Sequence, residues 1–222
     1  MIKEKLILFD IDSTLFDTQK YILTFMRKIG EELIAEDIED FVKIALAIYE
    51  ENKNNRLFFD LEGFSSVLSK KINRKIDNAK IRKIVFDEKL LEECIYPETL
   101  SVFKNLSNNK NLIFGIFSSG KTDFQLLKIK SIRDFIHEKH IHISIADKKS
   151  QVAKVLEKYN DNIKIYLIDD LLEILMTAKI FNPSITVIWS KRGRHMYDQK
   201  IDGFTPDFTV TSLTEIIKIV DQ

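Results

Sequence analysis

Four short apolar runs, separated by longer segments with helical periodicity, constrain the fold of this chain most. The runs hold four to seven residues without regular polar alternation: Leu6–Phe9, Asn111–Phe117, Ile163–Ile168 and Ile185–Trp189. Runs of this kind are typical of strands buried on both faces, as in a parallel sheet. The segments between and after them predict helices over Tyr96–Leu106, Asp123–Ile132, Ser150–Tyr159, Leu171–Phe181 and Ser212–Val220. This alternation predicts a doubly wound, Rossmann-like α/β fold around a parallel sheet.

The region from residue 19 to residue 93 has a different character. It shows helical periodicity, as in "YILTFMRKIGEELI" and "DFVKIALAIYEE", and no apolar strand run. We therefore expect an all-helical insertion, residues 19–93, after the first strand. The α/β core domain is then built from residues 1–18 and 94–222.

Composition narrows the classes of protein that this chain can belong to. Its 222 residues are 45% hydrophobic, which suits a sizeable core. The 34 basic residues balance the 34 acidic ones, which argues against nucleic acid or an anionic membrane as a partner. Cys94 is the only cysteine, so no intrachain disulfide is possible. Because no signal peptide and no membrane-length apolar segment are visible, we expect a cytoplasmic protein.

Polar side chains follow the predicted strands at the edge where ligands of parallel sheets gather. A parallel sheet brings the carboxyl ends of its strands together, so carboxylates, hydroxyls and a lysine converge there. Carboxylates are ligands that Mg²⁺ accepts, and a lysine, a hydroxyl and backbone N–H groups can neutralise a phosphate. The residues that follow the strands are Asp10, Asp12, Thr14, Ser118, Ser119, Gly120, Asp169 and Asp170, while Lys148 and Lys149 precede the predicted helix at Ser150.

These segments resemble the motifs of the haloacid dehalogenase (HAD) superfamily, in order and along the whole chain. "DIDST" resembles the first motif, DxDx[TV], and "GIFSSGKTDFQLLKI" resembles the second motif with its strand and helix. "LIDDLLEIL" is similar to the fourth, acidic motif. "ITVIWSKRGRH" and "PDFTVTSLTEIIKIV" are similar to the C-terminal strand and closing helix of many members. The helical insertion stands where the family places its cap.

The resemblance implies a role for each matching residue. Asp10 would be the nucleophile, forming an aspartyl-phosphate, and a Mg²⁺ ligand. Asp12 would protonate the leaving oxygen and then activate water, while its backbone carbonyl binds the metal. Ser118 would hydrogen-bond the phosphoryl group. The remaining implied residues are Thr14, Ser119 and Gly120 for the substrate, and Asp169 and Asp170 for the metal.

Two positions depart from the family pattern. The motif lysine is often followed by proline, but "ADKKSQVAKVL" offers two lysines without one. We favour Lys149 as the motif lysine, because Val152 then falls in the register of the family's shorter lysine motifs. Lys148 remains open. The fourth motif often carries a further acid or amide four residues after its first acid. Counted from Asp170 that position is Ile174, and counted from Asp169 it is Glu173. Which of the two aspartates binds the metal directly therefore stays open.

The implied activity is a Mg²⁺-dependent phosphatase acting on a small phosphorylated metabolite, its expected partner. The acid at Asp12 favours phosphoryl chemistry, because carbon–halogen hydrolysis in this superfamily does not use it. The alternatives are a phosphomutase or phosphotransferase of the same superfamily, or a catalytically weak protein that binds a phosphorylated ligand. The sequence gives no information on the oligomeric state.

Three further segments have a structural and a functional interpretation. The histidines His137, His140 and His142 suggest a transition-metal site, but we favour a surface or edge position away from the acidic cluster. "SKRGRH", residues 190–195, is a basic patch that would suit an anionic substrate, with a solvated loop as the favoured interpretation. "LFFDLEGF", residues 57–64, would line a substrate pocket, with helix packing favoured instead.

Overall fold

The structure is a computed structural model that describes residues 4–56, 59–160, 162–193, 196 and 199–221. The chain forms two compact units, one of Met1–Asp17 with Ile95–Gln222 and the other of Thr18–Cys94. These limits lie one residue from the predicted ones. The function of the second unit as a cap stays a prediction.

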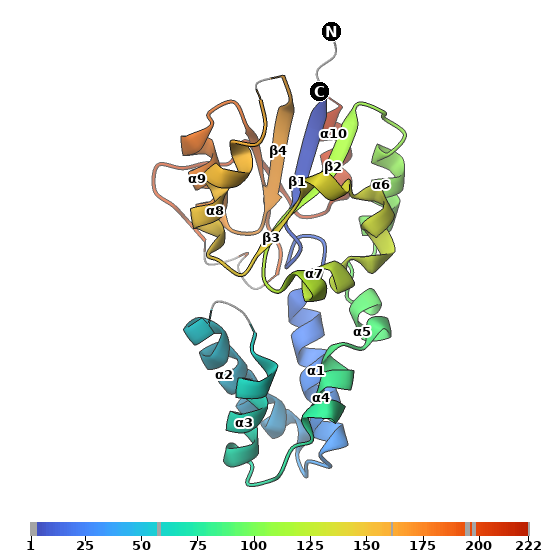
Figure 1. Cartoon of the computed structure of the whole chain (residues 1–222), viewed down its shortest axis with the longest axis vertical. Helices are drawn as coiled ribbons and strands as arrows, with labels where there is room; N and C mark the ends of the chain where they lie inside the picture. The colour runs from blue at the N-terminus through green and yellow to red at the C-terminus, as the bar shows by residue number, and fades with distance from the viewer. Residues whose placement is uncertain (1–3, 57–58, 161, 194–195, 197–198, 222) are drawn as a thin grey trace. The chain divides into compact units, whose positions relative to one another are not determined.

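A parallel sheet forms the centre of the first unit (Figure 1). Its six strands in the described residues have the order β3-β2-β1-β4-β5-β6, and all neighbours are parallel. The predicted runs correspond to β1, β2, β4 and β5, while β3 and β6 are short edge strands. The strands are β1 Lys5–Phe9, β2 Leu112–Ser119, β3 Ile141–Ser144, β4 Lys164–Asp169, β5 Thr186–Ser190 and β6 Phe208–Val210. The predicted doubly wound, Rossmann-like α/β fold is confirmed.

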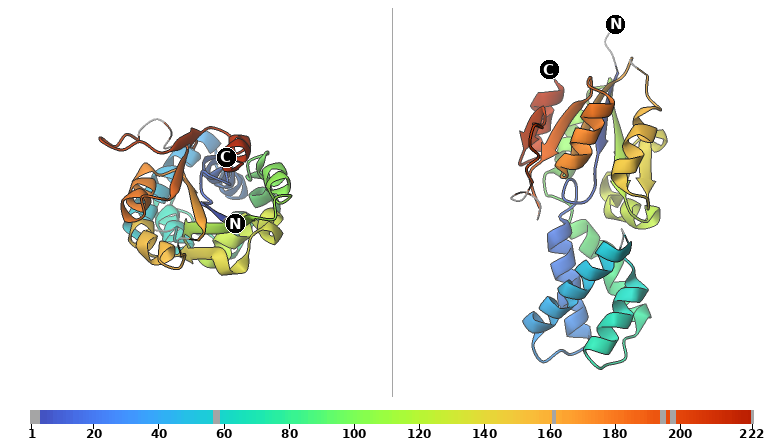
Figure 2. Two further views of the ribbon diagram at one scale, coloured as in Figure 1. Left: turned by 90° about the horizontal axis from the view of Figure 1, so that it is seen from above. Right: turned by 90° about the vertical axis from the view of Figure 1, so that its left-hand side faces the viewer.

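Strand β1 is buried on both faces, which explains its uninterrupted apolar sequence. Leu6 and Leu8 belong to a buried cluster with residues of α8, Lys148–Leu156, and α9, Leu172–Phe181. Side chains alternate along a strand, so Phe9 points to the other face, where its ring centroid lies 4.9 Å from that of Phe103. Phe103 belongs to α6, Thr99–Leu106. Helices thus cover both faces of the sheet (Figure 2), and β1 holds the residues that follow it in place.

All five predicted helices of this unit differ from the observed ones by one to four residues at one or both ends, and α7 and α8 differ at both ends. The predicted helix Asp123–Ile132 is α7, Thr122–Lys128, followed by the 3-10 helix η1, Lys130–Phe135. Helix α8 begins at Lys148 instead of Ser150, because the carboxylate of Asp147 is the N-cap and accepts a 2.9 Å hydrogen bond from the Ser150 N–H. The remaining elements are the 3-10 helix η2, Glu138–His140, and helix α10, Thr214–Val220.

Helices connected by turns make up the described residues of the second unit. Its helices are α1 Thr18–Glu32, α2 Ile38–Arg56, α3 Leu61–Lys71, α4 Asn78–Val85 and α5 Glu88–Glu93. An aromatic cluster joins three of its segments, with the ring of Phe59 at 5.0 Å from Tyr49, 5.4 Å from Phe64 and 5.9 Å from Phe25. Phe59 and Phe64 thus pack against helices of this unit, whereas residues 57 and 58 of the same predicted segment lie outside the described residues.

None of the helices in the described ranges combines the length and the apolar character that crossing a membrane requires.

Candidate active site

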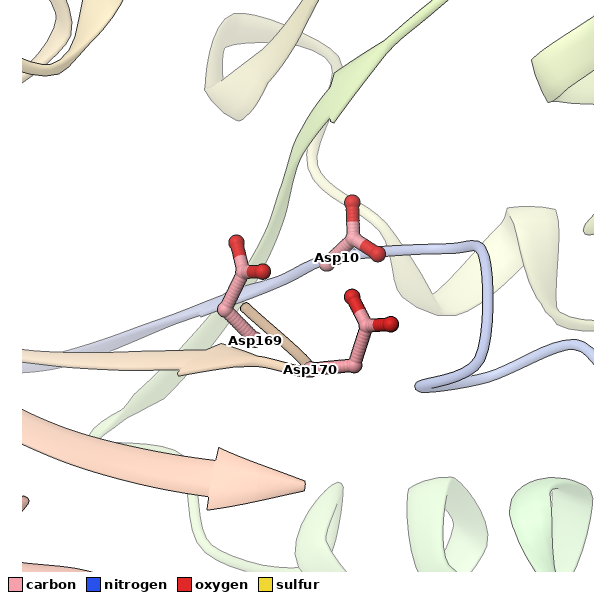
Figure 3. Close-up of side chains that lie close together, drawn as sticks. All are labelled: Asp10, Asp169 and Asp170. Carbon is pink, nitrogen blue, oxygen red and sulfur yellow. The ribbon is translucent and has the colours of Figure 1, made fainter. Parts of the chain in front are cut away.

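Strands β1 and β4 bring three buried aspartates together at one edge of the sheet. Asp10 follows β1 directly and donates its backbone N–H to the carbonyl of Ile168 in β4, at 2.9 Å. Asp169 ends β4 and Asp170 follows it. One carboxylate oxygen of each aspartate lies within 4.8 Å of the other two, and Figure 3 shows the three side chains next to one another. Among the described residues, this is the only group of three such side chains able to hold a metal ion.

Burial and the neighbouring negative charges raise the pKa of two of these carboxyl groups, Asp10 and Asp170. Asp10 is 4% exposed, Asp169 0% and Asp170 7%. Burial, together with the charges of Asp169 and Asp12, raises the pKa of Asp10 to about 7 against the lowering effect of Lys148. Burial and the charges of Asp10 and Asp169 likewise raise the pKa of Asp170 well above its ordinary value. A cluster of this kind is ready to exchange protons for a cation.

Lys148 provides the positive charge inside this cluster. Its Nζ lies 2.5 Å from Asp10 Oδ1 and 2.6 Å from Asp169 Oδ2, and the residue is 7% exposed. Burial opposes the charge of this ammonium, but the two carboxylates outweigh that effect and raise its pKa. Lys148 is therefore a permanent cation between two strand ends.

Lys149, which the sequence favoured as the motif lysine, lies outside the cluster of aspartates. Its ammonium pairs with Glu173 on the outer side of α9, and its side chain is 47% exposed. The cause is the early start of α8, which makes Lys148 the first helical residue and directs it into the cluster. Lys148, the alternative that the sequence left open, is the lysine beside Asp10.

Asp12 is held by two residues that the sequence did not single out. Lys128 Nζ lies 2.7 and 2.9 Å from the two carboxylate oxygens of Asp12. Gln125 Nε2 lies 2.8 Å from Asp12 Oδ2 and also donates to the backbone carbonyl of Ser119. Gln125 and Lys128 are three residues apart on α7, so they share one face of the helix. The spacing of three residues could have shown that these side chains lie on one helix face. It could not have shown that Asp12 is their partner.

The last two residues of β2 and the glycine that follows lie at the same edge of the sheet. Ser118 is 3% exposed, and Ser119 is half-buried at the strand end. Gly120 has a φ of +134°, and a Cβ at this position would lie only 2.9 Å from Gln125 Nε2. Glycine is therefore required here for both its backbone conformation and the close approach of Gln125.

The turn after Asp12 is tight and buried. Ser13 has a φ of 59°, and a Cβ on Gly193 would lie 2.6 Å from its Oγ. Thr14 is 0% exposed, and its Oγ1 has no hydrogen-bond partner among the described residues. Thr14 is thus fully buried in this turn, and its role in substrate binding stays a prediction.

The segment after β5 contradicts its interpretation as a solvated loop. Arg192 is 8% exposed, its Nη1 lies 2.8 Å from Glu98 Oε1, and its guanidinium lies 4.1 Å from the ring centroid of Tyr96. Arg192 is a buried structural cation because these two partners compensate for its desolvation. Residues 194 and 195 of the predicted patch lie outside the described residues.

Two of the three histidines share one partner. The hydroxyl of Tyr159 lies 3.0 Å from His140 Nδ1 and 2.6 Å from His142 Nε2. Burial and the nearby Lys158 lower the pKa of His142 to about 4. The third, His137, accepts a 3.3 Å hydrogen bond from the backbone N–H of Lys139. The described residues contain no triad of metal ligands that includes a histidine.

The site thus places a buried aspartate directly after the first strand of a doubly wound parallel sheet. The family model of haloacid dehalogenase-like hydrolases matches residues 4–179. The chain therefore belongs to the haloacid dehalogenase-like hydrolases. A search of curated proteins finds no match to this sequence.

Solved structures of low sequence identity share the fold. A protein assigned as a haloacid dehalogenase-like hydrolase from Burkholderia xenovorans LB400 has a TM-score of 0.77 and 21% identity, over 98% of this chain and 97% of that one. YfnB from Bacillus subtilis, assigned as a HAD hydrolase and solved with magnesium, has a TM-score of 0.67 and 16% identity, over 100% of both chains. The L-2-haloacid dehalogenase from Xanthobacter autotrophicus, with chloropropionic acid covalently bound, has a TM-score of 0.61 and 14% identity, over 100% of this chain and 99% of that one.

The raised pKa of Asp170 leads to a stability prediction. A carboxyl group whose pKa is raised by folding destabilises the folded state as pH rises above its unfolded value, and the effect is absent at lower pH. In EDTA at pH 8, Asp170→Asn should therefore raise the free energy of unfolding by about 1–2 kcal/mol, or about 2–8 °C in Tm. Near pH 4 the gain should disappear. Calorimetry at both pH values checks this, with Asp202→Asn as the control, because Asp202 is 96% exposed. An unchanged or lower Tm at pH 8 contradicts it.

Proposed function

We propose that this protein is a Mg²⁺-dependent phosphatase that hydrolyses a small phosphorylated metabolite through an aspartyl-phosphate. The observation that carries the proposal is the pair of carboxylates after β1. Asp10 lies in the buried cluster beside Lys148, while Asp12 lies outside it and is 34% exposed at its side chain. One carboxylate thus has the environment of a nucleophile, and the other has access to a leaving group. Hydrolysis of a carbon–halogen bond needs the first and makes no use of the second.

The reaction divides into two displacements at phosphorus. In the first, a carboxylate oxygen of Asp10 forms a bond to phosphorus, the bond to the leaving oxygen breaks, and Asp12 gives that oxygen a proton. In the second, Asp12 takes a proton from water, the water oxygen bonds to phosphorus, and the bond to Asp10 breaks. Lys148 offsets the negative charge of the nucleophile, and Ser118 donates to a phosphoryl oxygen.

We choose between Asp169 and Asp170 as the direct metal ligand by the hydrogen bonds and ion pairs that their carboxylate oxygens already make. Asp169 Oδ1 accepts a 3.0 Å hydrogen bond from the N–H of Leu171, and its Oδ2 pairs with Lys148. Asp170 has no ion pair among the described residues, so it is the better direct ligand, together with Asp10 and the backbone carbonyl of Asp12. Asp169 then supports the site through Lys148. A bound Mg²⁺ would supply positive charge that lets Asp10 and a phosphate approach one another.

Two side-chain donors hold the backbone carbonyl of Asp170, the proposed metal ligand, in place. Its carbonyl accepts hydrogen bonds from Trp189 Nε1 at 3.0 Å and from Gln199 Nε2 at 2.7 Å. Gln199 Oε1 also accepts from the N–H of Leu172 at 2.7 Å, so one amide group spans the turn. Ligands with fixed orientation lose less entropy when they bind a cation.

Phosphate release from a panel of phosphorylated metabolites tests the proposal, with halide release from 2-chloropropionate measured in parallel. We expect phosphate release with Mg²⁺ that falls at least about 100-fold in EDTA and returns with Mg²⁺, and no halide release. Halide release without phosphate release would contradict the proposal. Transfer of the phosphoryl group back to a sugar phosphate, in place of its release, would identify a mutase. Mg²⁺ binding without any turnover would identify a binding protein.

A further inference from the structure

Each carboxylate of the first motif has its own buried lysine. Lys148 of α8 pairs with Asp10, and Lys128 of α7 pairs with Asp12. The proposed reaction assigns a task to Lys148 and leaves Lys128 without one. Lys128 is only 6% exposed, and burying an ammonium costs several kcal/mol unless it is well paired.

The surroundings of Lys128 fix the ammonium at one place. Its Nζ contacts both oxygens of Asp12 and lies 5.2 Å from the ring centroid of Phe16 and 4.9 Å from that of Phe124. Cations bind favourably over aromatic faces, so the two rings hold the ammonium between them. A methionine would fill this space without the cost of burying a charge. Packing alone therefore does not account for a lysine here.

Gln125 completes the arrangement from the same face of α7. Its Nε2 lies between two acceptors, Asp12 Oδ2 and the carbonyl of Ser119. The opposite amide orientation would place oxygen against oxygen at both contacts, so the donor orientation is the stable one. Gly120 keeps the space open for this side chain. Two donors from one rigid helix thus define where the Asp12 carboxyl group points.

We propose that Lys128, assisted by Gln125, is a positioning residue that fixes the Asp12 carboxyl group in the orientation from which it exchanges a proton with the leaving group. The inference rests on the proposed phosphatase function. Lys128 acts through Asp12, with which its ammonium is paired. Up to departure of the leaving group, it therefore affects only the transfer of a proton to the leaving oxygen.

Two substrates of similar size separate this role from a structural one. Benzyl phosphate releases an alkoxide that needs a proton, whereas p-nitrophenyl phosphate releases a stable phenolate that does not. The quantity measured is kcat/KM, which covers the steps up to departure of the leaving group. Lys128→Met should lower it about 100-fold for benzyl phosphate and less than about 5-fold for p-nitrophenyl phosphate. Lys128→Arg, which keeps the charge, should restore part of the loss.

The matched control is Lys130→Met, an exposed lysine two residues further along, which should change neither value. In an Asp12→Asn background, Lys128→Met should leave the ratio of the two kcat/KM values unchanged, because its target is gone. Equal losses with both substrates, or an altered ratio in that background, would overturn the inference while the phosphatase stands. If the wild type releases phosphate with Mg²⁺ from neither ester and from no metabolite of the panel, the proposed function fails, and this inference fails with it.

Discussion

Asp10→Asn should reduce Mg²⁺-dependent phosphate release to background, a fall of about 10⁴-fold or more in kcat. The substitution keeps the shape of the side chain but removes the nucleophilic oxygen, and no other carboxylate of the cluster is free to replace it. Asp169 is engaged by Lys148 and the Leu171 N–H. Asp170 faces the proposed metal. Initial rates with and without Mg²⁺ measure the effect, and circular dichroism confirms that the variant is folded.

A comparison with Asp12→Asn separates the two carboxylates by role. Acid-quenched samples are examined by mass spectrometry for a phosphorylated peptide containing residue 10, with p-nitrophenyl phosphate as the substrate. Asp12→Asn should accumulate the phosphorylated peptide, because breakdown of the intermediate lacks its base, and should turn over about 10²–10⁴-fold more slowly. Asp10→Asn should show no label. Label in Asp10→Asn, or its absence in all samples that turn over, would contradict the proposed intermediate.

The sheet and its acidic edge could be predicted because both depend on local sequence. A strand buried on both faces must be apolar along its length, so β1 and β4 are visible as "LILF" and "IKIYLI". Carboxylates directly after such strands are placed by the strands themselves, since parallel pairing brings Asp10 beside Asp169 and Asp170. The short edge strands β3 and β6 were harder to predict, because partial exposure removes the apolar signal.

The choice between Lys148 and Lys149 depended on one helix boundary. With a helix that begins at Ser150, as predicted, both lysines would lie in a loop and neither would be fixed. With Asp147 as the N-cap, Lys148 is helical and buried, while its neighbour points about a quarter-turn away toward Glu173. Helix ends are the least certain part of a sequence-based assignment.

Long-range partners were beyond the reach of the sequence. Asp12 and Lys128 are separated by 116 residues, and Arg192 and Glu98 by 94. A lysine or arginine in a polar context is more often exposed than buried, so Arg192 was interpreted as part of a solvated loop. Only the fold shows that Lys128 and Arg192 are each buried beside a carboxylate.

The two adjacent lysines provide a matched pair of variants with very different expected effects. Lys148→Met should lower kcat about 10²–10³-fold, because the charge that offsets the nucleophile and the phosphate is lost. It should also lower the free energy of unfolding by about 3–5 kcal/mol in EDTA, because Asp10 and Asp169 are left buried without their cation. Lys149→Met should change kcat by less than about 2-fold and stability by less than about 1 kcal/mol, since its ion pair with Glu173 is largely exposed.

Because Lys148→Met loses stability as well as charge, its activity must be measured on protein shown to be folded. Urea unfolding with and without Mg²⁺ gives the first measurement, and kcat below the unfolding transition gives the second. Added Mg²⁺ should recover part of the lost stability, since a divalent cation can replace the missing charge among the aspartates, but it should not recover kcat. Full recovery of kcat by Mg²⁺ would mean that the lysine serves folding alone. A larger loss in Lys149→Met than in Lys148→Met would return the role to the residue that the sequence favoured.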